Sequence, residues 1–180
     1  MKQINKYILE RLHINKDTGN HYHNYNYHPK TCKELKGLVN KLINERGNDA
    51  DLNDIDTSKI TDISYLFYMD NFNGDISKWD VSNVTDMSFM FCGCRSFNRS
   101  LANWDVSKVT NMKYMFYRCE SFNQLLAKWN VYHVINMDCM FCWCKSFNQD
   151  ISKWNVSNVK NNNKIFYNCP IEEKYKPIFK

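Results

Sequence analysis

Cysteine is the residue with the clearest capacity for chemistry in this 180-residue chain, which contains eight of them. Cys139, Cys142 and Cys144 place three thiols within six residues, and zinc readily accepts sulfur ligands. A zinc site usually pairs two C-x-x-C motifs or adds nearby histidines, whereas only Cys92 and Cys94 echo this cluster. We therefore assign no metal ligand and no cofactor, and keep a metal- or redox-responsive cysteine cluster as the alternative hypothesis.

Four cysteines, at positions 94, 119, 144 and 169, recur at a fixed step of 25 residues. A fixed step indicates a structural repeat, so we expect small buried thiols stacked in one column. Successive thiols would lie within reach of disulfide bonds in an oxidising compartment. The sequence predicts no export signal, so reduced thiols are the first expectation.

The histidines do not indicate a metal site or a catalytic site. His21, His23 and His28 lie among tyrosines without carboxylates or cysteines at ligand spacing, and His133 is near Cys139 only in sequence. No nucleophile elbow, phosphate-binding loop or H-E-x-x-H motif occurs. We expect a protein that is not an enzyme.

Composition excludes several classes of protein. The chain is 43% hydrophobic and 15% aromatic with only five glycines and three prolines, which predicts one folded unit with a substantial core. Its formal net charge of +5 is spread along the chain, so no nucleic-acid partner is indicated. No long apolar stretch occurs, and the polar residues after Met1 predict neither a membrane span nor an export signal.

A 25-residue repeat organises the chain. Trp79, Trp104, Trp129 and Trp154 are each 25 residues apart, and an earlier copy has Ile55 in place of Trp. Valine, methionine and phenylalanine positions keep the same step, so we expect columns of like side chains in the core. Asn98, Asn123 and Asn148 should form a further column that hydrogen-bonds the backbone at the corners.

Within one unit, two spacings predict two elements. Alternation at Trp79 and Val81 matches the L-x-x-L-x-L skeleton of a leucine-rich repeat and predicts a short strand. Met87, Met90, Phe91 and Cys94 follow helical spacing and predict a short helix opposite the strand. The predicted fold class is an α/β repeat solenoid, leucine-rich-repeat-like, of about five 25-residue units.

Three regions are expected along the chain. Residues 1–51 form an N-terminal capping region, with an edge strand at residues 25–27 and an amphipathic helix at about 31–46. The repeats occupy residues 52–169, and residues 170–180 form a C-terminal cap. Residues 3–14 fit either a helix or a strand.

The unit W-[DN]-V-S-x-V-T-[DN]-M-x-x-M-F-x-x-C-x-S-F-N, clearest at residues 79–87, resembles the BspA-like leucine-rich-repeat surface proteins, the group also called DUF285. The resemblance covers residues 52–169 and implies a right-handed solenoid, often displayed on bacterial cell surfaces, in a family that includes adhesins. It implies no chemistry. This chain departs from the pattern in its cysteine column and its lack of an export signal, so a cytoplasmic location is equally compatible.

The residues that alternate with Trp and Val are expected to project outward and form a polar face for binding a protein or host surface. The third full unit adds aromatic and apolar area on this face, which makes residues 129–135 the expected hot spot. The predicted face consists of Lys78, Asp80, Ser82, Asn103, Asp105, Ser107, Lys128, Asn130, Tyr132, His133, Ile135, Lys153, Asn155 and Ser157. A structural or assembly role is the alternative function, and the sequence does not predict the oligomeric state.

Overall fold

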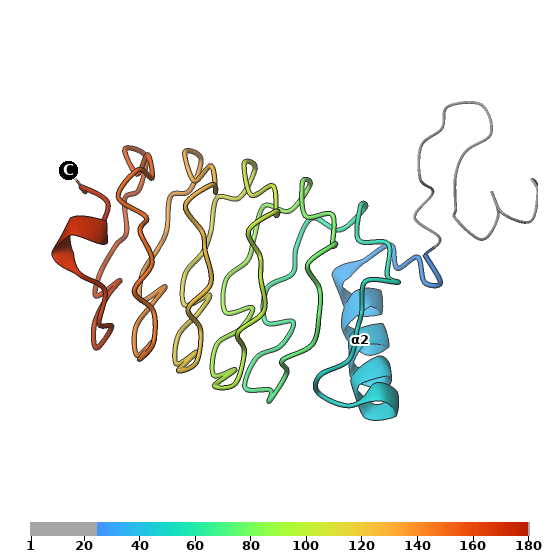
Figure 1. The fold of residues 1–180 in the computed structure, drawn as a ribbon. Helices are drawn as coiled ribbons and strands as arrows, with labels where there is room; N and C mark the ends of the chain where they lie inside the picture. Colours follow the sequence, from blue (N-terminus) through green and yellow to red (C-terminus); the bar gives the residue numbers. More distant parts are fainter. Residues whose placement is uncertain (1–24, 180) are drawn as a thin grey trace, which may run out of the picture.

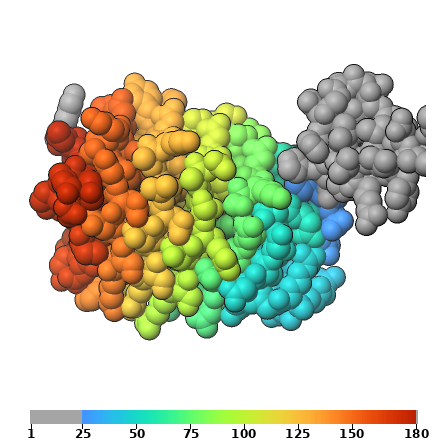
Figure 2. Space-filling view, viewed as in Figure 1, coloured from blue at the N-terminus to red at the C-terminus, as the bar shows by residue number. Residues whose placement is uncertain are grey.

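A computed structural model describes residues 25–179 and shows successive coils of backbone stacked side by side (Figure 1). Five coils begin at Leu52, Ile76, Leu101, Leu126 and Ile151, and we number them 1 to 5 in that order. In the space-filling view the coils form adjacent bands with no gap between them (Figure 2). Within the described residues the regular elements are one α-helix, α2 (Cys32–Arg46), and one short 3₁₀ helix, η1 (Glu173–Tyr175).

The expected α/β repeat solenoid is wrong, because residues 25–179 contain no β-strand and no helix within the coils. The predicted strand around Trp79 and Val81 is instead two tight turns. Asp75 and Asp80 each turn a side-chain oxygen onto the backbone N–H two residues later, at 2.9 and 3.0 Å. Side-chain bonds of this kind compete with sheet pairing, and they bend the chain where a strand would run straight.

The predicted helix around Met87–Cys94 is wrong for a different reason. Phe89 and Gly93 have φ values of 58° and 84°, in the left-handed region that ends a right-handed helix. Every coil has such a pair of left-handed residues. The backbone of this segment therefore alternates between left-handed and other conformations, although its apolar residues have the spacing of a helix. The segment expected as an edge strand at residues 25–27 forms only an isolated parallel bridge between Tyr27 and Ile55.

The coils are joined along this irregular segment by a ladder of backbone hydrogen bonds. From coil 2 to coil 3, the N–H groups of Met87, Phe89, Phe91 and Gly93 donate to carbonyl oxygens of residues 111, 113, 115 and 117 at 2.7–3.0 Å. The other three interfaces repeat these four bonds, always with the donor in the earlier coil. Isolated parallel bridges from Asp62 through to Asn161 mark the same register.

Identical aromatic residues stack inside the coils. One column of phenylalanine rings, at positions 67, 91, 116, 141 and 166, has centroid separations of 5.5–5.8 Å. A second, at 72, 97, 122 and 147, packs against it at 4.0–4.2 Å within each coil. Each repeat tryptophan is buried, and its indole N–H donates to a carbonyl of the preceding coil at 2.9–3.2 Å. The expected columns of like residues are therefore present.

The expected asparagine column is confirmed. Asn98, Asn123 and Asn148 each donate a backbone N–H to the asparagine Oδ1 one coil earlier, at 3.0 Å. These bonds satisfy backbone groups at a corner where the turn leaves them without a partner.

Helix α2 stands against coil 1 at one end of the stack (Figure 1). Thr31 caps it by accepting the N–H of Glu34, and the chain leaves it at Gly47, which has φ 87°. Its apolar stripe of Leu35, Val39, Leu42 and Ile43 is buried in the core. At the opposite end, the Ile151 N–H donates to the Tyr175 carbonyl, which fastens the η1 segment to coil 5.

Two glycines provide a matched test of this packing. A Cβ added at Gly74 would lie 2.2 Å from the Ala50 carbonyl oxygen, whereas one added at Gly37 in α2 would meet nothing within 4 Å. We predict that Gly74→Ala lowers the free energy of unfolding by about 2 kcal/mol, because it overpacks a backbone contact. Gly37→Ala should raise it by about 0.5–1 kcal/mol through helix propensity. Urea unfolding of both variants checks this, and equal effects would contradict the packing.

Candidate functional site

The polar face predicted from the sequence lies on the turns, not on a strand. Twelve of its fourteen residues are exposed, and Ser82 and Ser107 are half-buried. Asp80, Asp105 and Asn155 each accept a backbone N–H two residues later at 3.0–3.2 Å. These side chains therefore shape the turns, which explains their recurrence without reference to a partner.

Tyr132, His133 and Ile135 depart from the repeat pattern within this face. Tyr132 and Ile135 are 43% and 41% exposed, and the Tyr132 and His133 rings lie 5.2 Å apart. His133 Nδ1 lies 2.8 Å from the carbonyl oxygen of Ser107 in the preceding coil. This apolar group is accessible, as the sequence predicted, although it lies on a turn.

A second surface, which we call the aromatic face, lies along the outside of the backbone ladder. It contains three rows of side chains, one residue per coil, that recur at ladder positions. Tyr65, Tyr68, Met69 and Tyr167 are 42–66% exposed. The full face consists of Tyr65, Tyr68, Met69, Phe89, Tyr114, Tyr117, Arg118, Trp143 and Tyr167.

The left-handed residues of the ladder carry much of this face. Tyr65, Met69 and Phe89 have φ values of 56–58°, and Tyr114, Arg118 and Trp143 share this conformation. A side chain larger than that of asparagine is uncommon in the left-handed region, where it costs about 1–2 kcal/mol. The ladder holds these residues in place, so bulky groups are displayed on a fixed backbone.

Ring geometry limits what the aromatic face can bind. The Tyr65, Phe89 and Tyr114 rings stack face to face at 4.6 and 4.9 Å, within 9° of parallel. Their faces contact one another, so solvent meets mainly ring edges and hydroxyl groups. Such a row is poorly suited to stacking on a sugar ring and well suited to the edge contacts of a protein surface.

Positive charge accompanies the rings. The Arg118 guanidinium lies 5.4 Å from the Tyr117 ring and 6.0 Å from the Trp143 ring. Lys113 and Lys164 lie 5.5–5.6 Å from tyrosine rings of their own coils. Tyrosine, tryptophan and arginine together are the residues most enriched in energetically important protein interfaces.

Sequence reasoning missed the aromatic face because it assigned these positions to a helix. The available signal was the variation at three repeat positions: Tyr, Phe and Tyr at 65, 89 and 114, alternating Tyr and Cys from 68 to 167, and Met, Gly, Arg and Trp at 69, 93, 118 and 143. Within an otherwise monotonous repeat, bulky residues at variable positions indicate a surface that the core does not determine.

The cysteine cluster of coil 4 does not converge on one point. Cys142 Sγ donates to the Lys164 carbonyl and Cys144 Sγ donates to the Phe116 carbonyl, both at 2.8 Å, which directs them to opposite neighbouring coils. Cys139 lies beside Tyr114, and its hydrogen bond to that phenol raises the pKa of Tyr114 to about 12. Across residues 25–179, no three Cys, His, Asp or Glu side chains are grouped to hold a metal.

Cys94, Cys119 and Cys144 of the cysteine column are buried, Cys169 is half-buried, and all eight cysteines are free. Cys94 and Cys119 donate their thiols to carbonyls of Phe67 and Phe91 at 2.8 and 3.0 Å. Burial raises the pKa of Cys92 to about 11 and that of Cys119 well above its ordinary value. Cys94 and Cys119 are therefore protonated hydrogen-bond donors with a structural role, rather than nucleophiles.

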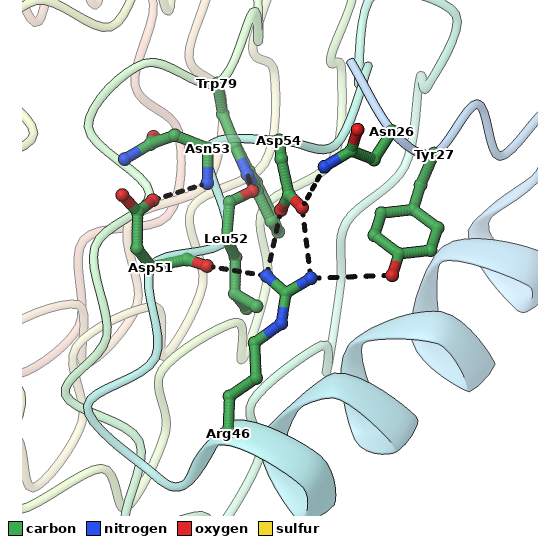
Figure 3. Close-up of polar contacts among 8 residues, drawn as sticks. All are labelled: Asn26, Tyr27, Arg46, Asp51, Leu52, Asn53, Asp54 and Trp79. Carbon is green, nitrogen blue, oxygen red and sulfur yellow. Dashed lines mark hydrogen bonds and ion pairs between the residues drawn. The ribbon is translucent and has the colours of Figure 1, made fainter.

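Polar side chains fasten the capping region to coil 1 (Figure 3). Arg46, the last residue of α2, donates to both carboxylate oxygens of Asp54 at 3.0 and 3.1 Å, and to the Tyr27 hydroxyl. This pairing lowers the pKa of Asp54 and raises that of Arg46. His28 pairs with Asp56 at 3.2 Å, while His21, His23 and the 3–14 segment lie outside the described residues.

A polar depression of about 400 Å³ lies next to this network, lined by Arg46, Asp51, Asn53, Asp54 and Lys78. The Arg46 guanidinium is already committed to Asp54, Tyr27 and the Asp51 carbonyl. The depression therefore belongs to the junction between α2 and coil 1 rather than to a catalytic arrangement.

The comparisons with known proteins now identify the family. A family model described as "Mycoplasma protein of unknown function, DUF285" matches residues 34–141 and 100–174. The chain belongs to the DUF285 family. No curated protein and no solved structure matches this DUF285 chain. Among residues 25–179, no helix is both long and apolar enough to cross a membrane.

The buried thiols predict a loss of stability in alkali. An unfolded thiol ionises at its ordinary pKa of 9.0, whereas Cys92 in the fold ionises at about 11. The fold retains the proton, so this contribution is complete below pH 9 and is lost as pH rises toward 11. We expect the free energy of unfolding to fall over this window.

Urea unfolding from pH 8 to pH 11 measures the effect. A matched variant carries serine at positions 94, 119 and 144, which keeps a buried donor that does not ionise. It should show a shallower decline than the native sequence, although its stability at pH 8 is lower. Parallel declines would show that the thiols at positions 94, 119 and 144 do not contribute.

Proposed function

We propose that this DUF285 protein is a non-catalytic recognition module that binds a protein partner through the aromatic face. The observation that carries the proposal is the row of accessible rings and Met69 on a backbone fixed by the ladder. A rigid surface loses little conformational entropy on binding, so contact area is converted efficiently into affinity.

The composition of the face supports a protein as the partner. Tyr68 and Met69 provide apolar area, Arg118 provides a guanidinium, and the stacked rings present their edges. Met69 lies across Gly93, where an added Cβ would meet its sulfur at 2.5 Å, so the absence of a side chain at Gly93 makes room for it. A flexible methionine beside fixed aromatic rings is a common feature of protein-binding surfaces.

The resemblance of residues 79–87 to BspA-like surface proteins supports a role in recognition at a cell or host surface, including adhesion. On this proposal Tyr132, His133 and Ile135 form a second, smaller contact group on the turns. Their exposure supports that assignment, and the two groups can be tested separately.

A comparison of three variants tests the proposal. Tyr68→Ser with Met69→Asn removes the most accessible part of the aromatic face, and asparagine tolerates the left-handed backbone at 69. A partner captured by photo-crosslinking from position 68 should lose at least about tenfold in affinity for this variant, because central interface residues contribute about 2 kcal/mol or more. Isothermal titration measures the affinity, and thermal unfolding checks that the fold is retained.

Two other variants control the comparison. Leu125→Ser removes an apolar side chain that is 63% exposed at a different corner of the coil, and it should leave affinity unchanged. Tyr132→Ser with Ile135→Thr removes the second contact group. A loss of affinity confined to that variant would move the binding surface to the turns, and no loss in any variant would refute recognition through either face.

A further inference from the structure

The backbone ladder has a direction. At each of the four coil interfaces, four N–H groups of the earlier coil donate to four carbonyl oxygens of the later one. Fewer backbone bonds run the other way, such as the Thr85 N–H to the Thr61 carbonyl and the Ser121 N–H to the Arg95 carbonyl. Aligned peptide groups of this kind add their dipoles, as they do along a helix. The stack therefore has a carbonyl end at coil 1 and an N–H end at coil 5.

The N–H end is open. The backbone N–H groups of Asn162, Lys164, Phe166 and Asn168 occupy the donor positions of coil 5, yet they donate no hydrogen bond within residues 25–179. These four residues are exposed or half-buried. The C-terminal segment bonds to coils 4 and 5 elsewhere, Tyr175 and Phe179 pack against the core, and Lys176 Nζ lies 5.7 Å from the Phe166 ring. We call this row the donor edge.

The carbonyl end is covered instead. Helix α2 stands against coil 1 at this end of the stack, and its apolar stripe is buried in the core (Figure 1). A second copy that met the donor edge with its own N-terminal end would present this helix rather than a row of carbonyls. Two donor edges facing each other would place N–H against N–H, so symmetric pairing is also unfavourable.

The donor edge is selective for backbone conformation. An ordinary β-strand presents N–H and C=O groups alternately along each edge, so half of its groups would meet the donor edge donor to donor. Along its ladder segment, a coil of this repeat, with its alternating left-handed residues, presents four carbonyls toward the preceding coil. Its phenylalanine would also cover the Phe166 ring, which is stacked on Phe141 at 5.8 Å and half-exposed, and would displace Lys176 Nζ from its position 5.7 Å from that ring.

We propose that the donor edge is a docking site for one coil of the same repeat supplied by another chain, which adds in parallel and extends the ladder. Recognition comes from four backbone hydrogen bonds and one further layer of stacked phenylalanine. This site is separate from the aromatic face, and it does not depend on the function proposed for that face.

Amide hydrogen exchange on the full chain, followed residue by residue by NMR, tests this docking. The probe is a synthetic peptide of residues 101–125, whose carbonyls at 111, 113, 115 and 117 accept the equivalent bonds within the stack. The matched internal controls are the amides of Met137, Cys139, Phe141 and Trp143, which hold the same positions one coil earlier and are bonded.

Without peptide, the four amides of the donor edge should exchange at least about 100-fold faster than their controls, because hydrogen-bonded core amides open rarely. Saturating peptide should slow them by at least about tenfold, and a peptide with Phe116→Asp should not. The Tyr68→Ser, Met69→Asn variant should bind the peptide as well as the native chain does, which separates this result from the proposed function.

Three results would overturn the proposal. The four amides could fail to slow at the highest soluble peptide concentration. They could slow with protein concentration alone, which would make a second copy the occupant. They could slow equally in inorganic phosphate without peptide, which would make the donor edge an anion site.

Discussion

The backbone hydrogen bonds between coils set the register of the stack, and the packing of the core depends on that register. Four bonds at each interface set the register at one repeat, and only in that register do the phenylalanine columns lie ring over ring at 5.5–5.8 Å. A slip of one residue would bring Phe91 against Met115 or Tyr117 instead of Phe116. The polar ladder and the apolar core thus specify the same alignment, and this agreement allows a fold with almost no regular secondary structure to be unique.

The same ladder divides each coil into two kinds of surface. On the turns, aspartate and asparagine side chains accept hydrogen bonds from backbone N–H groups two residues later, so the repeated polar residues there stabilise the local turn. Along the ladder, backbone groups satisfy one another across coils, which frees the outward side chains to vary. Variation is concentrated at the positions of Tyr68, Met69 and Trp143, while the core positions stay constant. A surface that can change without cost to the core is where binding specificity can accumulate.

The periodicity of the sequence was sufficient to predict the stacking, the core columns and the asparagine column, because each follows from superposing like residues. It was not sufficient to predict secondary structure. The alternation at Trp79 and Val81 has the period of a strand, but the side chains of Asp75 and Asp80 accept backbone N–H groups two residues later and stabilise turns instead. The spacing from Met87 to Cys94 has the period of a helix, but the left-handed φ at Phe89 cannot be deduced from a phenylalanine. The aromatic face was missed as a consequence, since its residues were placed on a helix that does not exist.

Every interface between coils uses the same set of backbone N–H and C=O groups, and this uniformity has an evolutionary consequence. Coils 2, 3 and 4 each receive and donate the same ladder bonds, so none of them is tied to the helix at one end or the short C-terminal turn at the other. Duplication or deletion of one whole 25-residue unit between Trp79 and Trp154 would change the length of the molecule by one layer and leave both ends intact. Related chains of different lengths can therefore arise by simple genetic events, each carrying one more or one fewer set of outward side chains.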